Sequence, residues 1–245
     1  MHWKPAAFLT AVALCVAGAL PGAVDQDKQP VQVTKTETFS FPEGGTLRLG
    51  KSIGEVDIEG WDQPGVEITT TKSTQDIYFP KDRETGLKDL ERVQVSAKLV
   101  GDALVVTTEY PRHRAFPWIS PVSDTNRFDL EYHIMVPRNA RIVVTHGAGD
   151  VSVDDVKGNI DISVTQGLIT LLLEGDAPRS ISAKADLGTV ESDFAGTETR
   201  HPWPLGHDVQ GSASGVSQSL NLKIRFGDIV IRKAFEPDAA AVSTK

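Results

Sequence analysis

Residues 149–171 contain one short pattern three times, as Gly149-Asp-Val-Ser-Val153, Gly158-Asn-Ile-Asp-Ile162 and Gly167-Leu-Ile-Thr-Leu171. In each copy a glycine precedes aliphatic residues that alternate with mainly polar ones, and the three glycines are nine residues apart. Glycine reaches backbone angles that are closed to other residues. Alternation places the aliphatic and polar side chains on opposite faces of a strand. The pattern therefore predicts short strands joined at glycine corners.

The same unit occurs elsewhere in the chain. The further copies are Ser52-Ile-Gly54-Glu-Val-Asp-Ile58, Gly188-Thr-Val-Glu-Ser192 and Gly227-Asp-Ile-Val-Ile231. No single unit can bury its apolar face, whereas a stack of units can. The sequence therefore predicts an all-β protein of repetitive architecture, a solenoid or prism in which each strand stacks on its neighbour.

Outside this repeat, short alternating runs separated by Gly, Pro or Asp continue along most of the chain. Such runs are typical of half-buried strands. We predict one domain over residues 36–236, with halves at 36–110 and 128–236. Residues 83–92 have the only helix-like pattern. Because Gly86 weakens it, we expect one or two helical turns at most.

Two stretches break the alternation and are predicted to be long loops. Residues 111–127 contain three prolines, and residues 196–219 combine a Pro-Trp-Pro segment with a run of glycine and serine. Loops of this length within a compact domain are often functional. The polar residues 24–35 predict a flexible lead-in, so we expect order to begin near Thr36. Residues 237–245 predict a disordered tail.

The first 23 residues have the features of a secretory signal peptide. A basic start with Lys4 precedes an apolar stretch from Ala6 to Leu20 and a small-residue end at Ala23. The apolar stretch is shorter than the roughly 20 residues that span a bilayer, and no later stretch is longer. We therefore expect an exported protein, periplasmic or extracellular, without a transmembrane segment. Cys15, the only cysteine, lies within the signal.

The charge of the chain limits its partners. With a formal net charge of −8 and no long basic run, the sequence argues against nucleic acid and anionic membranes as partners. A hydrophobic content of 40% indicates a globular chain rather than a disordered one. No motif predicts a cofactor, and an envelope protein or a glycan is the expected kind of partner.

Three segments resemble a bacterial family of exported, adhesin-like proteins built on a domain of unknown function. They are Gly54-Glu-Val-Asp-Ile-Glu-Gly-Trp-Asp62, Ile134-Met-Val-Pro-Arg-Asn-Ala-Arg-Ile-Val-Val-Thr145 and Phe226-Gly-Asp-Ile-Val-Ile-Arg232. The resemblance implies a right-handed, single-stranded β-solenoid or β-prism-like fold. It also implies a cell-envelope or secreted location and provides no catalytic residues.

Two kinds of site that the repeat itself suggests are disfavoured. The calcium-binding nonapeptide needs an Asp two positions after a glycine, whereas Asp150 follows Gly149 directly. Paired acids of a β-helical polysaccharide enzyme would protonate a leaving oxygen and activate water. The aspartates that could do so are Asp150, Asp154, Asp155 and Asp161. Solvated surface acids are the commoner interpretation of such residues.

Other reactive motifs are weaker still. Gly211-Ser-Ala-Ser-Gly215 has Ala213 where a nucleophile elbow needs serine. His113, His201 and His207 lie in the two predicted loops but lack a recognised ligand spacing. We therefore predict no catalytic residues and no metal site.

The loop aromatics are the best binding candidates. Trp, Tyr and Arg supply large rigid areas and directed hydrogen bonds at binding hot spots. The candidates are Tyr110, Arg112, Arg114, Phe116, Trp118 and Trp203. Their rings could instead cap the ends of the stack, where sheet edges must be covered.

The leading hypothesis is a non-enzymatic envelope or secreted β-solenoid protein that binds a partner or acts as a scaffold through its loops. One alternative is a small glycoside hydrolase or lyase that uses the aspartates of residues 150–161. Another is a purely structural protein whose repeat surfaces self-assemble.

Overall fold

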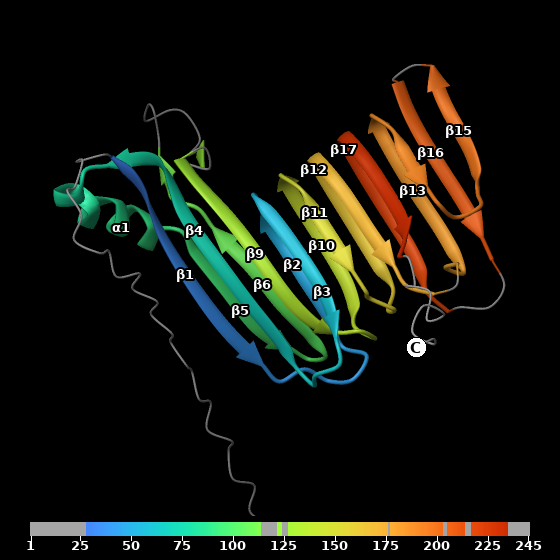
Figure 1. Ribbon diagram of the computed structural model, residues 1–245, viewed down its shortest axis with the longest axis horizontal. Helices are drawn as coiled ribbons and strands as arrows, with labels where there is room; N and C mark the ends of the chain where they lie inside the picture. The colour runs from blue at the N-terminus through green and yellow to red at the C-terminus, as the bar shows by residue number, and fades with distance from the viewer. Residues whose placement is uncertain are drawn as a thin grey trace, which may run out of the picture.

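The computed structural model describes residues 28–113, 122–123, 127–175, 177–202, 205–213 and 217–234. These residues form an all-β protein with one short α-helix and one 3-10 turn, η1 (Pro80–Asp82). The main elements are β1 (Gln29–Phe39), β2 (Thr46–Ser52), β3 (Glu55–Trp61), β4 (Val66–Tyr78), α1 (Arg83–Glu91), β5 (Gln94–Val100), β6 (Ala103–Glu109), β7 (Arg112–His113), β8 (Val122–Ser123), β9 (Phe128–Pro137), β10 (Arg141–Ala148), β11 (Val151–Asp154), β12 (Ile160–Leu173), β13 (Ser180–Leu187), β14 (Val190–Ser192), β15 (Thr197–Pro202), β16 (Leu205–Ser212) and β17 (Ser219–Lys233). The strands stand side by side in one long row (Figure 1).

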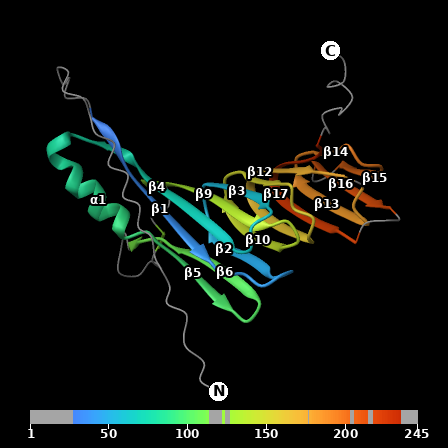
Figure 2. The same ribbon diagram turned by 60° about the horizontal axis from the view of Figure 1, so that its bottom comes forward.

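All described strands except β7 and β8 belong to one large mixed sheet, which has two layers. Layer A contains β5, β6, β2, β10, β13, β16 and β15, and layer B contains β1, β4, β9, β3, β11 and β14. Strands β12 and β17 belong to both layers. The first half of β12 pairs with β10, and its second half pairs with β11. Long strands that change partners halfway therefore connect the two layers (Figure 2).

A column of five glycines marks the bend between the layers. Gly54, Gly149, Gly167, Gly227 and Gly188 all have positive φ, between 109° and 142°. A Cβ atom added to any of them would lie 1.8–2.0 Å from a backbone carbonyl oxygen of the neighbouring strand. Only glycine fits such an approach and such a backbone conformation. The predicted glycine corners are therefore confirmed at these five positions, and we call them the glycine column.

A full turn of the chain through both layers takes 18 residues in this region, so the nine-residue glycine spacing is half a turn. Gly149 and Gly167, 18 residues apart in the sequence, stack directly in the glycine column, because the Cβ of Gly167 would lie 2.0 Å from the Gly149 oxygen. Gly158 lies between them at the opposite edge, where its Cβ would lie 2.0 Å from the oxygen of Ala140. Successive glycines of the repeat therefore form turns at alternate edges.

Alternating aliphatic side chains from both layers fill one hydrophobic core. Burial in β9 and β17 follows the predicted period of two along much of each strand. The core includes Leu49, Ile58, Ile134, Ile142, Ile162, Ile169, Leu222 and Ile229, each at most 1% exposed. The prediction of half-buried strands is thus confirmed.

The strand arrangement does not establish the predicted solenoid or prism. The sheet does not close, and β17 lies between β12 and β13, out of chain order. After β14 the chain forms the β15–β16 hairpin on the outer edge of β13, and it returns as β17 on the inner edge. A purely sequential stack of strands is therefore not what forms here.

Three local predictions were wrong. Residues 29–35 of the expected lead-in belong to strand β1, because β1 pairs with β4 along its length. Residues 196–219 are largely strands rather than a loop, because β16 finds a long-range partner in β13 and β15 pairs with β16. Helix α1 is nine residues long, slightly more than two turns of 3.6 residues.

The buried Gly86 lets α1 pack closely on β1 and β4. A Cβ at Gly86 would lie 2.6 Å from Cγ2 of Val31 and 3.1 Å from the Tyr78 ring. Lys72 of β4 donates hydrogen bonds of 3.0 Å to the oxygens of Leu90 and Val93 at the end of the helix. The glycine that weakens the helix pattern is therefore needed for its packing.

Several predictions fall outside the described residues. These are the signal peptide over 1–23, the tail over 237–245 and most of the loop over 111–127, of which residues 112–113 pair with 122–123. Among the residues that the structure covers, no helix has the length and apolar character needed to cross a membrane.

Candidate functional site

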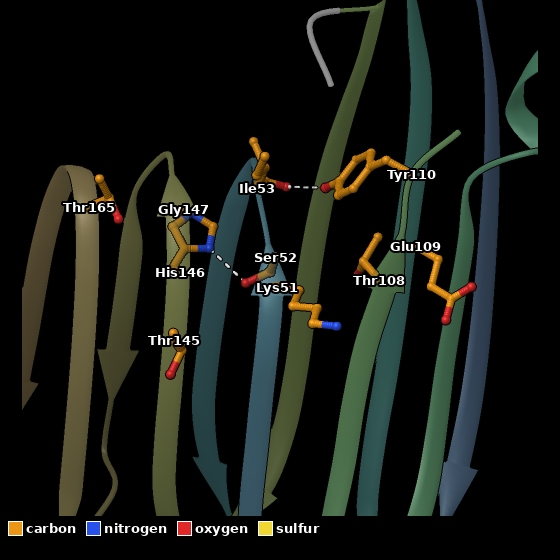
Figure 3. A pocket seen from close by; sticks show the side chains of 10 residues that line it. All are labelled: Lys51, Ser52, Ile53, Thr108, Glu109, Tyr110, Thr145, His146, Gly147 and Thr165. Carbon is orange, nitrogen blue, oxygen red and sulfur yellow. Dashed lines mark hydrogen bonds between the residues drawn. The ribbon is translucent and has the colours of Figure 1, made fainter. Parts of the chain in front are cut away.

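A pocket of about 800 Å³ lies beside the glycine column, where strands of layer A approach its corners. Figure 3 shows its walls, which come from the ends of β2, β6 and β10 and from β12. The lining residues are Lys51, Ser52, Ile53, Thr108, Glu109, Tyr110, Thr145, His146, Gly147 and Thr165. The pocket size is within the range of about 300–1,000 Å³ that is usual for small-molecule sites.

The pocket is a consequence of where the glycine column stops. Strand β2 continues into layer B through the corner at Gly54. Its neighbour β6 ends at Glu109 without such a corner. At this step Tyr110 leaves layer A, and its hydroxyl donates a 3.3 Å hydrogen bond to the oxygen of Ile53. The missing corner leaves a hollow that Tyr110 partly closes.

A β-bulge at Lys51 shapes one wall of the pocket. Thr145 pairs with Gly50 and His146 pairs with Ser52, so Lys51 is an extra residue, and its φ is 59°. Strict alternation would point Lys51 into the core behind Leu49, where an unpaired ammonium is costly. The bulge instead turns Ser52 inward and leaves Lys51 exposed at the pocket.

The inward Ser52 forms a buried pair with His146. The Ser52 Oγ lies 2.8 Å from Nδ1 of His146, and the two residues are 0% and 2% exposed. Burial lowers the pKa of His146, although the backbone carbonyls of Gly54 and Ala148 act in the opposite direction. Because Ser52 is fully buried, its hydroxyl is not placed to attack a bound molecule. The pair connects β2 to β10 below the pocket.

Two tyrosines close the boundary between the layers. Tyr132 of β9 in layer B lies with its hydroxyl 2.5 Å from Oγ1 of Thr108 in β6. Burial raises the pKa of Tyr110 to about 12, and it also raises the pKa of Tyr132. Both phenols therefore stay protonated at neutral pH and can serve as hydrogen-bond donors.

Four exposed polar side chains complete the lining. They are the ammonium of Lys51, the carboxylate of Glu109 and the hydroxyls of Thr145 and Thr165. Within the described part of the chain, none of these four side chains forms a hydrogen bond or an ion pair. The pocket thus presents one cation, one anion and two neutral hydroxyls.

Of the six predicted binding residues, the structure places one side chain, that of Tyr110, at the pocket. Arg112 lies in β7, but its side chain is outside the described residues, as are Arg114, Phe116, Trp118 and Trp203. The sequence interpretation missed Lys51, Glu109 and His146. A signal was present in Lys51-Ser52-Ile53, where the strict alternation of β2 fails just before Gly54.

The four candidate catalytic aspartates have separate structural partners or settings. Oδ1 of Asp150 accepts a 3.0 Å hydrogen bond from the backbone N of Leu168, beside the corner at Gly167. Asp155 forms an ion pair with Arg138. Asp161 accepts a hydrogen bond from Asn221. Asp154 ends β11, and its pKa is raised by burial and by the charges of Glu59, Asp57 and Glu174.

The equivalent of Asp150 in the last unit has the same structural role. Oδ1 of Asp228 accepts a 2.7 Å hydrogen bond from the backbone N of Thr189, the residue after Gly188. Each of these Gly-Asp pairs thus caps the neighbouring corner. The calcium interpretation is therefore unnecessary to explain these aspartates.

Of the three predicted loop histidines, His207 has a described side chain. Nδ1 of the buried His207 accepts a 3.0 Å hydrogen bond from the backbone N of Val190. The side chains of His113 and His201 lie outside the described residues. Within the described ranges, no three His, Cys, Asp or Glu side chains gather in a way that could hold a metal ion.

Comparisons with known proteins give distant structural similarity. No family model matches the chain, and no curated protein does. A "putative cell adhesion protein" from Clostridium sporogenes is 14% identical, with a TM-score of 0.40 over 84% of this chain and 100% of its own. A "putative adhesin" from Bacteroides fragilis is 11% identical, with a TM-score of 0.27 over 86% of this chain and 100% of its own.

A "putative lipid binding protein" from Parabacteroides distasonis is 9% identical, with a TM-score of 0.23 over 84% of this chain and 97% of its own. Two of the three names refer to adhesion, and the third refers to lipid binding. At this similarity they say nothing about the ligand of this chain.

Proposed function

We propose that this chain is a non-enzymatic, exported binding protein of the cell envelope or the extracellular space, and that it holds its ligand in the pocket beside the glycine column. The observation that carries the proposal is a set of polar side chains, without partners among the described residues, that the bulge and the missing corner present at one concave place. Lys51 and Glu109 are exposed there beside the ordered ring of Tyr110.

The proposal is supported by the chemistry of the walls. A polar side chain that is held near a pocket without a protein partner is available to a ligand. Ser52 and His146, which line the pocket, are buried against each other, so the Ser52 hydroxyl has little access to a bound molecule. Export is supported by the signal-like residues 1–23.

The proposal is tested with the full mature chain and the double variant Lys51→Ala/Glu109→Ala. Labelled protein is titrated onto envelope fragments of the source cells, and saturable binding is measured. We expect the apparent Kd of the variant to rise at least tenfold, the loss expected from removing about 1.4 kcal/mol of interaction. Its melting temperature should stay near that of the unaltered protein, because both side chains are exposed.

The matched control is Lys157→Ala/Glu43→Ala, which removes one exposed cation and one exposed anion at the opposite edge of the sheet, next to Gly158 and ahead of the start of β2. The control should bind like the unaltered chain. Equal binding by all three proteins, or no saturable binding by any of them, would contradict the proposal.

A further inference from the structure

We infer that the pocket takes a neutral saccharide, a ligand that is rich in hydroxyl groups and has an apolar ring face. This inference rests on the proposed function and adds the chemical class of the ligand. It is drawn from the lining groups themselves, which differ from those suited to a charged headgroup or to an acyl chain.

The hydrogen-bonding groups of the pocket are mixed in kind. Lys51 can only donate, Glu109 can only accept when ionised, and the hydroxyls of Thr145 and Thr165 can do both. These groups come from different walls, β2, β6, β10 and β12. A sugar hydroxyl is both a donor and an acceptor. Strands β6, β2, β10 and β12 are consecutive in the sheet, so the outer two are about 14 Å apart. A saccharide of two or more rings can therefore reach all four side chains at once.

The charges of the lining cancel, which disfavours a charged ligand. Lys51 and Glu109 are the ionised side chains among the described lining residues, since His146 is buried with a lowered pKa. An anionic headgroup would be attracted by Lys51 but repelled by Glu109. A cationic ligand would be attracted by Glu109 but repelled by Lys51. A neutral ligand can use both side chains as charge-assisted partners.

The apolar part of the lining is small and rigid. It consists mainly of Ile53 and the ring of Tyr110, and the hydrogen bond from Tyr110 to the Ile53 oxygen holds the ring in place. An acyl chain would leave the threonine hydroxyls and both charges without partners in a desolvated site. The C–H face of one sugar ring can instead pack on the ordered Tyr110 ring, with little further loss of side-chain entropy.

The inference is tested with an immobilised panel of neutral oligosaccharides, oligosaccharides that contain uronic or sialic acid, and vesicles of POPC and of POPC with POPG. We expect the unaltered chain to bind one or more neutral oligosaccharides in a saturable way. Thr165→Val, which keeps the shape of the side chain and removes its hydroxyl, should weaken this binding about threefold to tenfold. Lys51→Ala and Glu109→Ala should each weaken it at least tenfold, and Lys157→Ala, at the opposite edge of the sheet, should leave it unchanged.

The outcomes separate the ligand class from the proposed function. Binding only to acidic oligosaccharides or to POPG vesicles, lost in Lys51→Ala but not in Glu109→Ala, would overturn the saccharide class assigned here and keep the pocket as the site. Binding of neutral oligosaccharides that all the variants retain would overturn the inference as well. If no probe binds and the envelope assay also shows no dependence on Lys51 and Glu109, the inference and the proposed function both fail.

Discussion

The two ends of the molecule connect their two layers of strands in different ways. Towards the C-terminus, β12 and β17 run parallel in register from the Ile160–Leu220 pair to the Leu173–Lys233 pair, and they pass from one layer to the other at stacked glycines. Towards the N-terminus, β1–β4 and β5–β6 are antiparallel pairs in separate layers, and their ends lie near α1 (Figure 2).

The difference shows what the glycine column does. Where a strand crosses between layers at a glycine, the two layers are covalently joined at a fixed spacing. Where strands end or turn back within one layer, as β6 does, side chains must hold the layers together. The contact between Thr108 and Tyr132 and the hydrogen bond from Tyr110 to Ile53 do so at the boundary. The pocket lies where strands that cross between the layers adjoin strands that stay within one layer.

The largest expected effect comes from breaking the glycine column at its centre. In Gly167→Ala the new methyl group would lie 2.0 Å from the oxygen of Gly149, at a φ of 141°. Backbone strain and the displaced neighbour together should lower the free energy of unfolding by about 3 kcal/mol or more. Urea unfolding monitored by circular dichroism measures the loss.

Two controls divide that loss into its causes. Gly101→Ala also places alanine at a positive φ, 65°, but with no atom within 4 Å of the new Cβ. It should lose only about 1–2 kcal/mol. Gly50→Ala adds a methyl group in open space without a positive φ, and it should be nearly neutral. Similar losses for Gly167→Ala and Gly101→Ala would show that the close approach in the column does not matter.

A second, smaller effect should be confined to the N-terminal region. Leu90 of α1 is 1% exposed, so Leu90→Ala should cost about 2–4 kcal/mol locally. Because no glycine corner joins β1 and β4 to the stack, amide hydrogen exchange should quicken in α1, β1 and β4 and remain slow in β12 and β17. Leu99→Ala, at a residue 49% exposed, is the control and should change little. Equal acceleration throughout the sheet would contradict two separable regions.

The smallest effect concerns pH at the boundary. Since burial lowers the pKa of His146 below its usual 6.5, the unfolded chain binds the proton first as the pH falls. His146 should therefore reduce stability as the pH drops through about 6.5, by at most about 1.4 kcal/mol per pH unit. In His146→Gln this contribution is absent.

The check is the unfolding free energy from urea titrations at pH 7.5 and pH 5.5. The decrease between the two values should be smaller in His146→Gln than in the unaltered chain. Contributions from groups that the substitution leaves unchanged cancel in this difference. An equal decrease in both proteins would show that the buried Ser52–His146 pair does not respond to pH.

The corners and the strand faces could be predicted because they depend on neighbouring residues. Alternation assigned Val56 and Ile58 to the core, and both are fully buried. The glycines at 54, 149, 167, 188 and 227 were recognisable from the aliphatic runs that follow them. The strand at 205–212 was missed because its local composition favours a loop, whereas pairing with β13 decides its structure.

The candidate site was found only in part for the same reason. Tyr110 was identified by its residue type. Lys51, Glu109 and Thr165 come together from segments that are far apart in the sequence, through the registers of β2, β6, β10 and β12. No local sequence pattern predicts that these three residues lie near one another.

The sequence by itself therefore determined an all-β chain, the faces of most strands and the five corners, because backbone angles and strand periodicity are properties of a few adjacent residues. Only the tertiary structure decided that β17 enters between β12 and β13, that the sheet stays open, and that a missing corner beside Gly54 leaves a pocket. These features follow from which distant strands pair and in which register. That choice is made by the packing of the whole core.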